Sequence, residues 1–166
     1  SWFSKLDENK NLYWIIIYND YPIGLIHIKD IDFELESGEA GIFIGEPSYL
    51  EMPQSMLAIL FMMEVAFSVL KLKTLKAKIQ AGNKHSINFN ERLGYELNAN
   101  QKSEFHYYDV TQEQFEKATN KLRVSAAKMY GGETGIKLSG RELNLHRKLA
   151  TIADDTSYFN PFFLPA

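Results

Sequence analysis

The sequence contains no cysteine, which excludes disulfides, thiolate nucleophiles and cysteine-ligated metals. Basic residues are also few, because 18 Lys and Arg against 21 Asp and Glu leave a net charge of −3. Phosphate neutralisation needs clustered Lys and Arg, so this balance argues against nucleic-acid binding. No pair of histidines has metal-ligand spacing, and we therefore predict no metal site. The four histidines are His27, His85, His106 and His146.

Long apolar runs are absent as well. The longest, Met56–Leu70, is interrupted by Glu64 and Ser68 and is shorter than the roughly 20 residues that cross a bilayer. We interpret it as a buried helix. The chain begins Ser-Trp-Phe, without the pattern of a signal peptide. We accordingly expect a cytoplasmic protein that binds no membrane.

The composition is that of a folded protein with a real core. Of the 166 residues, 45% are hydrophobic and 13% aromatic, which excludes disordered and fibrous classes. A chain of this length can bury roughly 68–70% of the surface that its unfolded form exposes. We predict a main domain over residues 1–110 and a C-terminal helical extension over residues 111–166.

Short runs of β-branched and aromatic residues predict strands in the first part of the chain. Leu12–Tyr18 and Pro22–Ile31 are two such runs, and Asn19-Asp20 between them predicts a β-hairpin. Ala40–Gly45 predicts a third strand. One face of the second strand is expected to carry Ile23, Leu25, His27 and Lys29.

The middle of the chain alternates between helix and strand signals. Pro53 suits the first turn of a helix over Pro53–Leu70, where its missing N–H is not needed. Thr74–Ala81 alternates apolar and polar residues, which predicts a strand with one buried face. A short helix is predicted over Asn83–Leu93, ended by Gly94.

The last part predicts two strands and then helices. Tyr95–Leu97 and Glu104–Val110 form the expected antiparallel pair. Two capping boxes follow, Thr111 with Gln114 and Ser139 with Glu142. They predict helices over Gln112–Tyr130 and Gly140–Ala153, followed by the apolar tail Tyr158–Ala166.

This order of elements predicts an α+β fold with a mixed, mostly antiparallel sheet and flanking helices. The Met56–Leu70 helix is apolar almost all round, which is more than a helix with one solvent face requires. Its second side therefore needs a cover, either the C-terminal helices or a second subunit in a homodimer.

The segment Ala66–Leu97 carries a family pattern. Asn83, Ser86, Arg92, Leu93, Gly94 and Tyr95 fall in register with Asn-x-x-Ala/Ser-(x)3-Tyr-x-Lys-Leu-Gly-Phe. Together with the order of elements, this segment resembles the GNAT superfamily of N-acyltransferases, and most nearly its ribosomal-protein and nucleotide-amino-sugar branch. The resemblance covers about 100 residues. It implies that the family's first strand and first helices, which help to form the acceptor site, lie before Ser1.

The resemblance implies acetyl-CoA as co-substrate and direct attack of an amine on its thioester. It makes Ala40–Gly45 a strand that splays from its neighbour to admit the pantetheine arm, and Glu51–Met56 the turn that binds pyrophosphate at a helix N-terminus. The residues that it assigns to coenzyme binding are Phe43, Ile44, Gly45, Pro53, Gln54, Ser55, Met56, Asn83 and Ser86.

Two positions depart from the family pattern. Leu50 and Pro53 replace the leading polar residue and the first glycine of the phosphate motif, and Pro53 deletes an amide donor. Asn90 stands where the family has the tyrosine that protonates the leaving thiolate. Tyr49, Tyr95, Tyr107 and Tyr108 are the possible substitutes.

The candidate catalytic residues are Glu46, His27 and Asn90. Glu46 follows the splayed strand, where a carboxylate can accept the amine proton through a water. His27 can accept it near neutral pH. Asn90 can donate a hydrogen bond to the sulfur.

Three functions remain open from the sequence. The first is N-acyl transfer to a primary amine of a small molecule, with an amino sugar among the candidates. The second is a GNAT-like module that has lost catalysis and serves in binding or assembly. The third is acylation of a protein N-terminus or a ribosomal protein.

Overall fold

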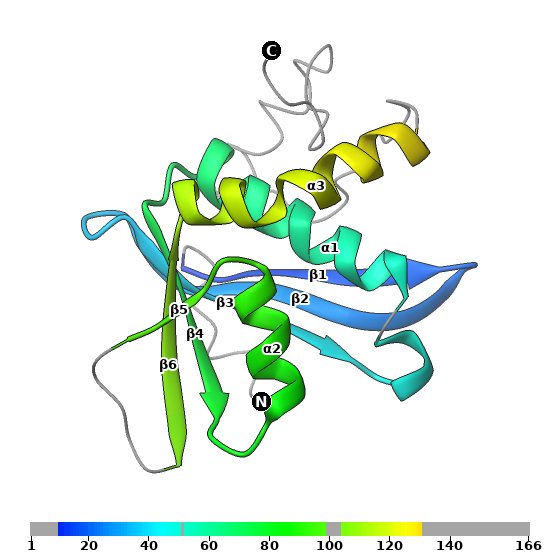
Figure 1. The fold of residues 1–166 in the computed structure, drawn as a ribbon, viewed down its shortest axis with the longest axis horizontal. Helices are drawn as coiled ribbons and strands as arrows, with labels where there is room; N and C mark the ends of the chain where they lie inside the picture. Colours follow the sequence, from blue (N-terminus) through cyan, green and yellow to red (C-terminus); the bar gives the residue numbers. More distant parts are fainter. Residues whose placement is uncertain (1–9, 51, 99–103, 131–166) are drawn as a thin grey trace.

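The computed structural model describes residues 10–50, 52–98 and 104–130, and these form one mixed sheet with helices (Figure 1). The predicted helix Gly140–Ala153, the Ser139–Glu142 capping pair and the tail Tyr158–Ala166 lie outside the described residues. The capping box of Thr111 and Gln114 is confirmed. Thr111 N donates to Gln114 Oε1 at 2.8 Å, and Gln114 N donates to Thr111 Oγ1 at 3.3 Å.

The described residues form a six-stranded sheet in the order β1-β2-β3-β4-β6-β5. The strands are β1 (Leu12–Tyr18), β2 (Tyr21–Asp32), β3 (Ser37–Ile44), β4 (Thr74–Gln80), β5 (Glu96–Leu97) and β6 (Phe105–Thr111). All neighbouring pairs are antiparallel except β3 with β4, which is parallel. The predicted α+β class with a mixed, mostly antiparallel sheet is confirmed.

The β1–β2 hairpin turns at Asn19 and Asp20, whose φ angles of 49° and 64° are those of a tight hairpin turn. The prediction that Ile23 shares the face of His27 was wrong. The pairing shifts at this end of the hairpin, from Ile16 with Gly24 to Ile17 with Pro22. The extra residue is a β-bulge that places Ile23 in the core, where it is 4% exposed.

The helices follow the predicted positions with changes at their ends. α1 spans Pro53–Glu64 and continues as a π-helical turn, η3 (Val65–Val69), in which Leu70 N donates to Val65 O at 2.9 Å. α2 (Lys84–Arg92) is capped by Asn83, whose Oδ1 accepts from Ser86 N at 3.0 Å. α3 spans Gln112–Tyr130.

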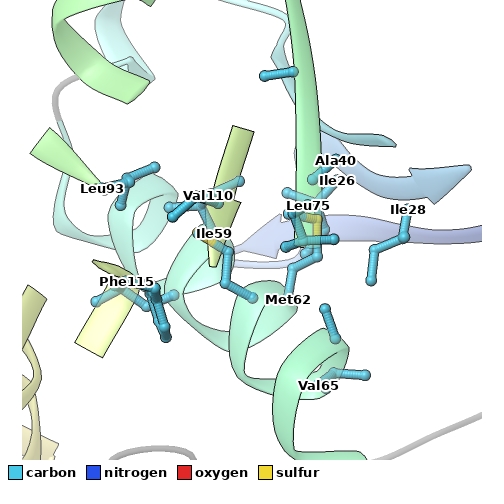
Figure 2. Close-up of a cluster of buried hydrophobic side chains, with 14 of the residues drawn as sticks. Ile26, Ile28, Ala40, Ile59, Met62, Val65, Leu75, Leu93, Val110 and Phe115 are labelled. Carbon is cyan, nitrogen blue, oxygen red and sulfur yellow. The ribbon is translucent and has the colours of Figure 1, made fainter. Parts of the chain in front are cut away.

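One face of the sheet carries the core. Figure 2 shows side chains of α1, among them Ile59 and Met62, packed between those of the strands, such as Leu75 and Val110. Leu75 and Val110 are fully buried, as is Phe115 of α3 at 1% exposure. Two connections join parallel strands: β3 to β4 through α1, and β4 to β5 through α2. Both proceed in the same direction across the sheet, and right-handed connections of this kind place α1 and α2 on the same face.

The second side of α1 is covered by α3, which lies beside it in Figure 1. Phe67 and Phe115 are in ring contact with centroids 5.7 Å apart. Arg123 Nη2 donates to Glu64 Oε2 at 2.9 Å, and both side chains are largely buried. The expectation that a C-terminal helix covers the apolar helix is confirmed for α3. The homodimer stays a prediction.

The opposite face of the sheet bears exposed apolar side chains. Ile15, Ile17 and Phe43 are 59%, 64% and 66% exposed. Within the described ranges, no helix combines the length and apolarity that crossing a bilayer demands.

Candidate active site

The two parallel strands β3 and β4 separate after three residue pairs. Ser37, Gly38 and Glu39 pair with Thr74, Leu75 and Lys76. Beyond Glu39 and Lys76, β3 stays paired with β2 only, and β4 with β6 only. The facing edges of residues 40–44 and 77–80 therefore have no partner strand among the described residues. A gap that narrows toward Glu39 opens in the middle of the sheet.

A cavity of about 330 Å³ occupies this gap. Its lining includes Ser55, Asn90 and Tyr95 from the helical face. It also includes His27, Lys29 and Glu39, which alternate with core residues and so lie on the opposite face. Since the lining comes from both faces, the cavity passes through the sheet. Two molecules can therefore approach the gap from opposite sides.

Three ionisable groups gather at the narrow end of the gap, on the face away from the helices. Lys29 Nζ lies 2.8 Å from Glu39 Oε1, and this hydrogen-bonded pair raises the pKa of Lys29. The His27 ring lies over Gly41, where a Cβ would come within 2.5 Å of Cε1. Gly41 thus makes room for the imidazole.

Burial lowers the pKa of His27, and the charge of Lys29 lowers it further, although Glu39 and Asp30 act in the opposite direction. His27 is therefore a neutral base at pH 7. A neutral imidazole beside a carboxylate and an ammonium group can accept a proton from a bound amine.

On the helical face, Asn90 and Tyr95 reach the same cavity. Asn90 Nδ2 donates to the carbonyl of Ser86 at 2.8 Å, so its amide is bonded back into α2. Tyr95 N donates to Asn90 O at 3.1 Å, and its side chain is 4% exposed. Burial raises the pKa of the Tyr95 hydroxyl, and the charges of Asp109 and Glu39 add to this effect.

The turn before α1 contains η2 (Pro47–Tyr49), and its donors are largely bonded within the turn. Ser55 N donates to Met52 O at 3.1 Å, and Ser55 Oγ to Tyr49 O at 2.7 Å. Pro53 has no amide hydrogen. Gln54 Oε1 is buried without a hydrogen-bond partner in the described part of the chain. The turn offers an anion fewer donors than a glycine-rich turn would.

The family of the chain follows from its sequence as well as from this splayed sheet. The family model described as the acetyltransferase (GNAT) domain matches residues 1–96, more than half of the 166 residues. The chain belongs to the GNAT acetyltransferase family.

Solved structures share the GNAT fold. The dodecameric spermidine N-acetyltransferase from Vibrio cholerae is 15% identical, with a TM-score of 0.57 over 65% of this chain and 68% of that one. The N-acetyltransferase PseH from Campylobacter jejuni, in complex with acetyl coenzyme A, is 21% identical, with a TM-score of 0.54 over 63% of this chain and 70% of that one. No curated protein matches the sequence. At these identities the similarity establishes the fold.

The cavity in the gap between β3 and β4 brings together some of the predicted site residues. His27, Ile44, Ser55, Asn83, Ser86 and Asn90 line it. Pro53 and Met56 line a separate hollow between α1, α2 and α3. Phe43, Gly45, Glu46 and Gln54 line neither of these cavities. Glu46 is exposed and precedes η2.

Sequence reasoning did not single out Glu39 and Lys29 for the GNAT site. Glu39 lay outside the predicted strand Ala40–Gly45, because Ser37-Gly38-Glu39 has little β propensity. The parallel ladder with Thr74–Lys76 extends β3 back over these residues. If the third strand had been predicted to begin at Ser37, the alternation of side chains along it would have placed Glu39 on the same face of the sheet as His27.

In the described part of the chain, no group of three His, Asp or Glu side chains is arranged to hold a metal ion.

Proposed function

We propose that this GNAT protein transfers an acyl group, in the first instance acetyl, from coenzyme A to a primary amine of a small molecule. The single observation that carries the proposal is the cavity through the gap between β3 and β4, lined from both faces of the sheet. The family membership and the acetyl-coenzyme-A complex of PseH support it.

The gap suits the pantetheine arm because the facing edges of β3 and β4 are unpaired there. Gly41 and Ala77 line the gap, and their small size leaves room for the arm. Asn83, Ser86 and His85 at the start of α2 lie at the same cavity and would hold the outer part of the coenzyme. The thioester supplies an activated carbonyl when it is bound. The fit is weakest at the Leu50–Ser55 turn, where the amides of Met52 and Ser55 and the Ser55 hydroxyl donate within the turn.

On the other face, the chain supplies the groups that an amine needs. Glu39 would bind the ammonium form of the acceptor in competition with Lys29, its ion-pair partner. His27 would accept the proton that the nitrogen releases, because its imidazole is neutral at pH 7.

Titration calorimetry with acetyl-CoA and CoA tests the proposal. We expect binding with a dissociation constant in the micromolar range, followed by release of free thiol when an amine acceptor is added. The absence of binding at millimolar ligand would contradict the transferase proposal. It would favour the second candidate, a GNAT module without catalysis, which the internally bonded Leu50–Ser55 turn supports.

The charge of the lining predicts the class of acceptor. Lys29 and Lys78 line the cavity with Glu39 as their acidic counterpart, and Lys78 lies over the Phe105 ring at 4.3 Å. Like charges brought together disfavour binding. We therefore expect kcat/KM for a nucleotide-linked amino sugar to exceed that for spermidine by about tenfold or more, since 1.4 kcal/mol is a factor of ten.

The exposed Lys78 allows a control for this preference. Lys78→Glu is expected to narrow the ratio between the two acceptors or to invert it, with acetyl-CoA affinity measured in parallel. A higher kcat/KM for spermidine than for the nucleotide-linked amino sugar in the unsubstituted protein would overturn this prediction.

A pH effect on stability is expected from His27. Its folded-state pKa is below that of the unfolded chain, about 6.5. As the pH falls below 6.5, the unfolded state binds a proton that the folded state resists, so the free energy of unfolding decreases. Denaturant unfolding of His27→Asn and the unsubstituted protein at pH 7 and pH 5 should show the variant gaining relative stability at pH 5. A difference that does not change with pH would argue against a buried neutral His27.

A further inference from the structure

The ion pair of Lys29 and Glu39 is built into the sheet at the narrow end of the gap. The two residues face each other in the antiparallel register of β2 and β3, and Lys29 Nζ lies 2.8 Å from Glu39 Oε1. Both residues line the cavity, and their side chains are 36% and 29% exposed. A ligand in the cavity can therefore reach both charges.

The base of the proposed transfer adjoins this pair. His27 and Lys29 are two residues apart on β2, so they share one face of the sheet with their Cα atoms roughly 7 Å apart. Glu39 is likewise two residues from Gly41, over which the imidazole lies. The charges of Lys29 and Glu39 both act on the pKa of His27. An amine bound at the pair therefore lies beside the group that takes its proton.

An acceptor that carries only an ammonium group matches this pair poorly. To bind Glu39 it must compete with Lys29, which is held at that carboxylate by a hydrogen bond as well as by charge. In the described part of the chain, Lys29 forms an ion pair with no other carboxylate. Two ammonium groups would share one carboxylate, and like charges brought together oppose binding.

An α-amino acid removes this conflict, because it brings an anion together with its ammonium group. Its nitrogen and its carboxyl carbon are two bonds apart, about 2.5 Å by standard bond lengths. That spacing is close to the 2.8 Å between Lys29 and Glu39. The carboxylate can replace Glu39 as the partner of Lys29, while the ammonium group replaces Lys29 as the partner of Glu39. One ion pair becomes two, and no charge is left without a partner.

A nucleotide-linked amino sugar suits the pair less well. Its phosphates are further from its amine than the carboxylate of an α-amino acid is, so an amine bound at Glu39 leaves Lys29 without an adjacent anion. The phosphates would instead reach more distant charges such as Lys78, which lies over the Phe105 ring on the other side of the gap.

We propose that the acceptor is an α-amino acid whose carboxylate binds Lys29 and whose ammonium group binds Glu39. The inference rests on the proposed acyl transfer and names its class of acceptor. In the step, the ammonium group loses a proton to the imidazole of His27, and the nitrogen lone pair forms a bond with the thioester carbonyl carbon. The carbon–sulfur bond breaks and its electron pair leaves on sulfur. Nitrogen then loses a second proton, which reaches the thiolate through water, and the imidazolium releases its proton to water.

The test compares free amino acids with their α-amides as acceptors in the full chain. An α-amide keeps the amine and the side chain but lacks the carboxylate. Release of free thiol from acetyl-CoA is measured for the standard L-amino acids and the matched amides. For the best amino acid we expect kcat/KM to exceed that of its amide by about tenfold or more, mainly through KM, because one charged hydrogen bond is lost in the amide.

Substitution of Lys29 separates this contact from a general effect of charge. Lys29→Met should bring the ratio between amino acid and amide close to one, with acetyl-CoA affinity unchanged, and Lys29→Arg should keep most of the preference. Lys73→Met is the matched control, because it also breaks an ion pair, that of Lys73 with Glu36, but Lys73 does not line the cavity. It should leave both the ratio and the activity unchanged.

Three results would overturn the amino-acid acceptor while leaving the proposed transfer intact. The first is amides that match or exceed the free amino acids throughout the panel. The second is a higher kcat/KM for spermidine or a nucleotide-linked amino sugar than for every amino acid, and the third is an unchanged ratio in Lys29→Met. Failure of the unsubstituted protein to bind acetyl-CoA, or to acetylate any of these amines, would instead refute the proposed function itself.

Discussion

Replacement of Glu64 by leucine is expected to lower the free energy of unfolding by about 3–5 kcal/mol, the cost of removing one partner of a buried ion pair. Glu64 Oε2 accepts from Arg123 Nη2 at 2.9 Å, and the Arg123 side chain is 5% exposed. Ser68 Oγ also donates to Glu64 Oε1 at 2.6 Å. The substitution would leave a guanidinium charge in the core between α1 and α3.

The loss is larger than the usual cost of a salt bridge because Arg123 is already poorly compensated. Its Nε is buried without a hydrogen-bond partner in the described residues, and its guanidinium lies 5.5 Å from the Phe115 ring centroid. Without Glu64, that ring would be the main favourable neighbour. A cation–ring contact contributes about 0.5–2 kcal/mol, which is less than the cost of an unpaired buried charge.

Chemical denaturation of three variants checks this prediction. Glu36→Leu breaks the exposed pair with Lys73 and should cost no more than about 1 kcal/mol. The double variant Glu64→Leu with Arg123→Met should recover most of the loss, because a buried pair can be replaced by apolar side chains. The prediction is wrong if Glu64→Leu costs no more than Glu36→Leu.

Replacement of Gly94 by alanine should lower the free energy of unfolding by roughly 2–5 kcal/mol. The φ of 94° is one that L-residues adopt at a cost of about 1–2 kcal/mol. In addition, the new Cβ would lie 2.7 Å from the backbone oxygen of Gln114. The start of α3 would have to shift, and overpacking of this kind costs about 1–3 kcal/mol.

Gly82 provides the matched control, because a Cβ there would meet nothing within 4 Å. Gly82→Ala should leave stability within about 1 kcal/mol. Gly94→Ala should also weaken the proposed acetyl transfer, since Tyr95, which lines the cavity, follows directly and its position depends on this turn. Equal melting temperatures for the two variants would show that α3 yields to the new methyl group without cost.

Much of the fold could be predicted from local patterns. The alternation of Thr74–Gln80, the Thr111–Gln114 capping box and the helix stop at Gly94 are short-range signals, and each is confirmed. Such signals depend on side-chain periodicity and on the hydrogen bonds of neighbouring residues, which a sequence displays directly.

The errors arose where distant residues decide local structure. Ile23 is turned into the core by a bulge against β1, and β3 begins at Ser37 because Thr74–Lys76 pair with it. The salt bridge between Glu64 and Arg123 joins residues 59 positions apart. No periodicity within either segment indicates such pairs.

The residues of the candidate site also fall into those that the sequence indicated and those that only the tertiary structure brought together. The segment Ala66–Leu97, together with the order of elements, indicated the GNAT family and the asparagine in place of the usual acid, because these depend on residue identity at fixed spacing. Only the tertiary structure decided that Glu39, Lys29 and His27 meet across β2 and β3, and that Tyr95 shares a cavity with Asn90. The physical reason is that a gap between two strands is defined by pairing that stops, and where a ladder stops depends on the whole sheet.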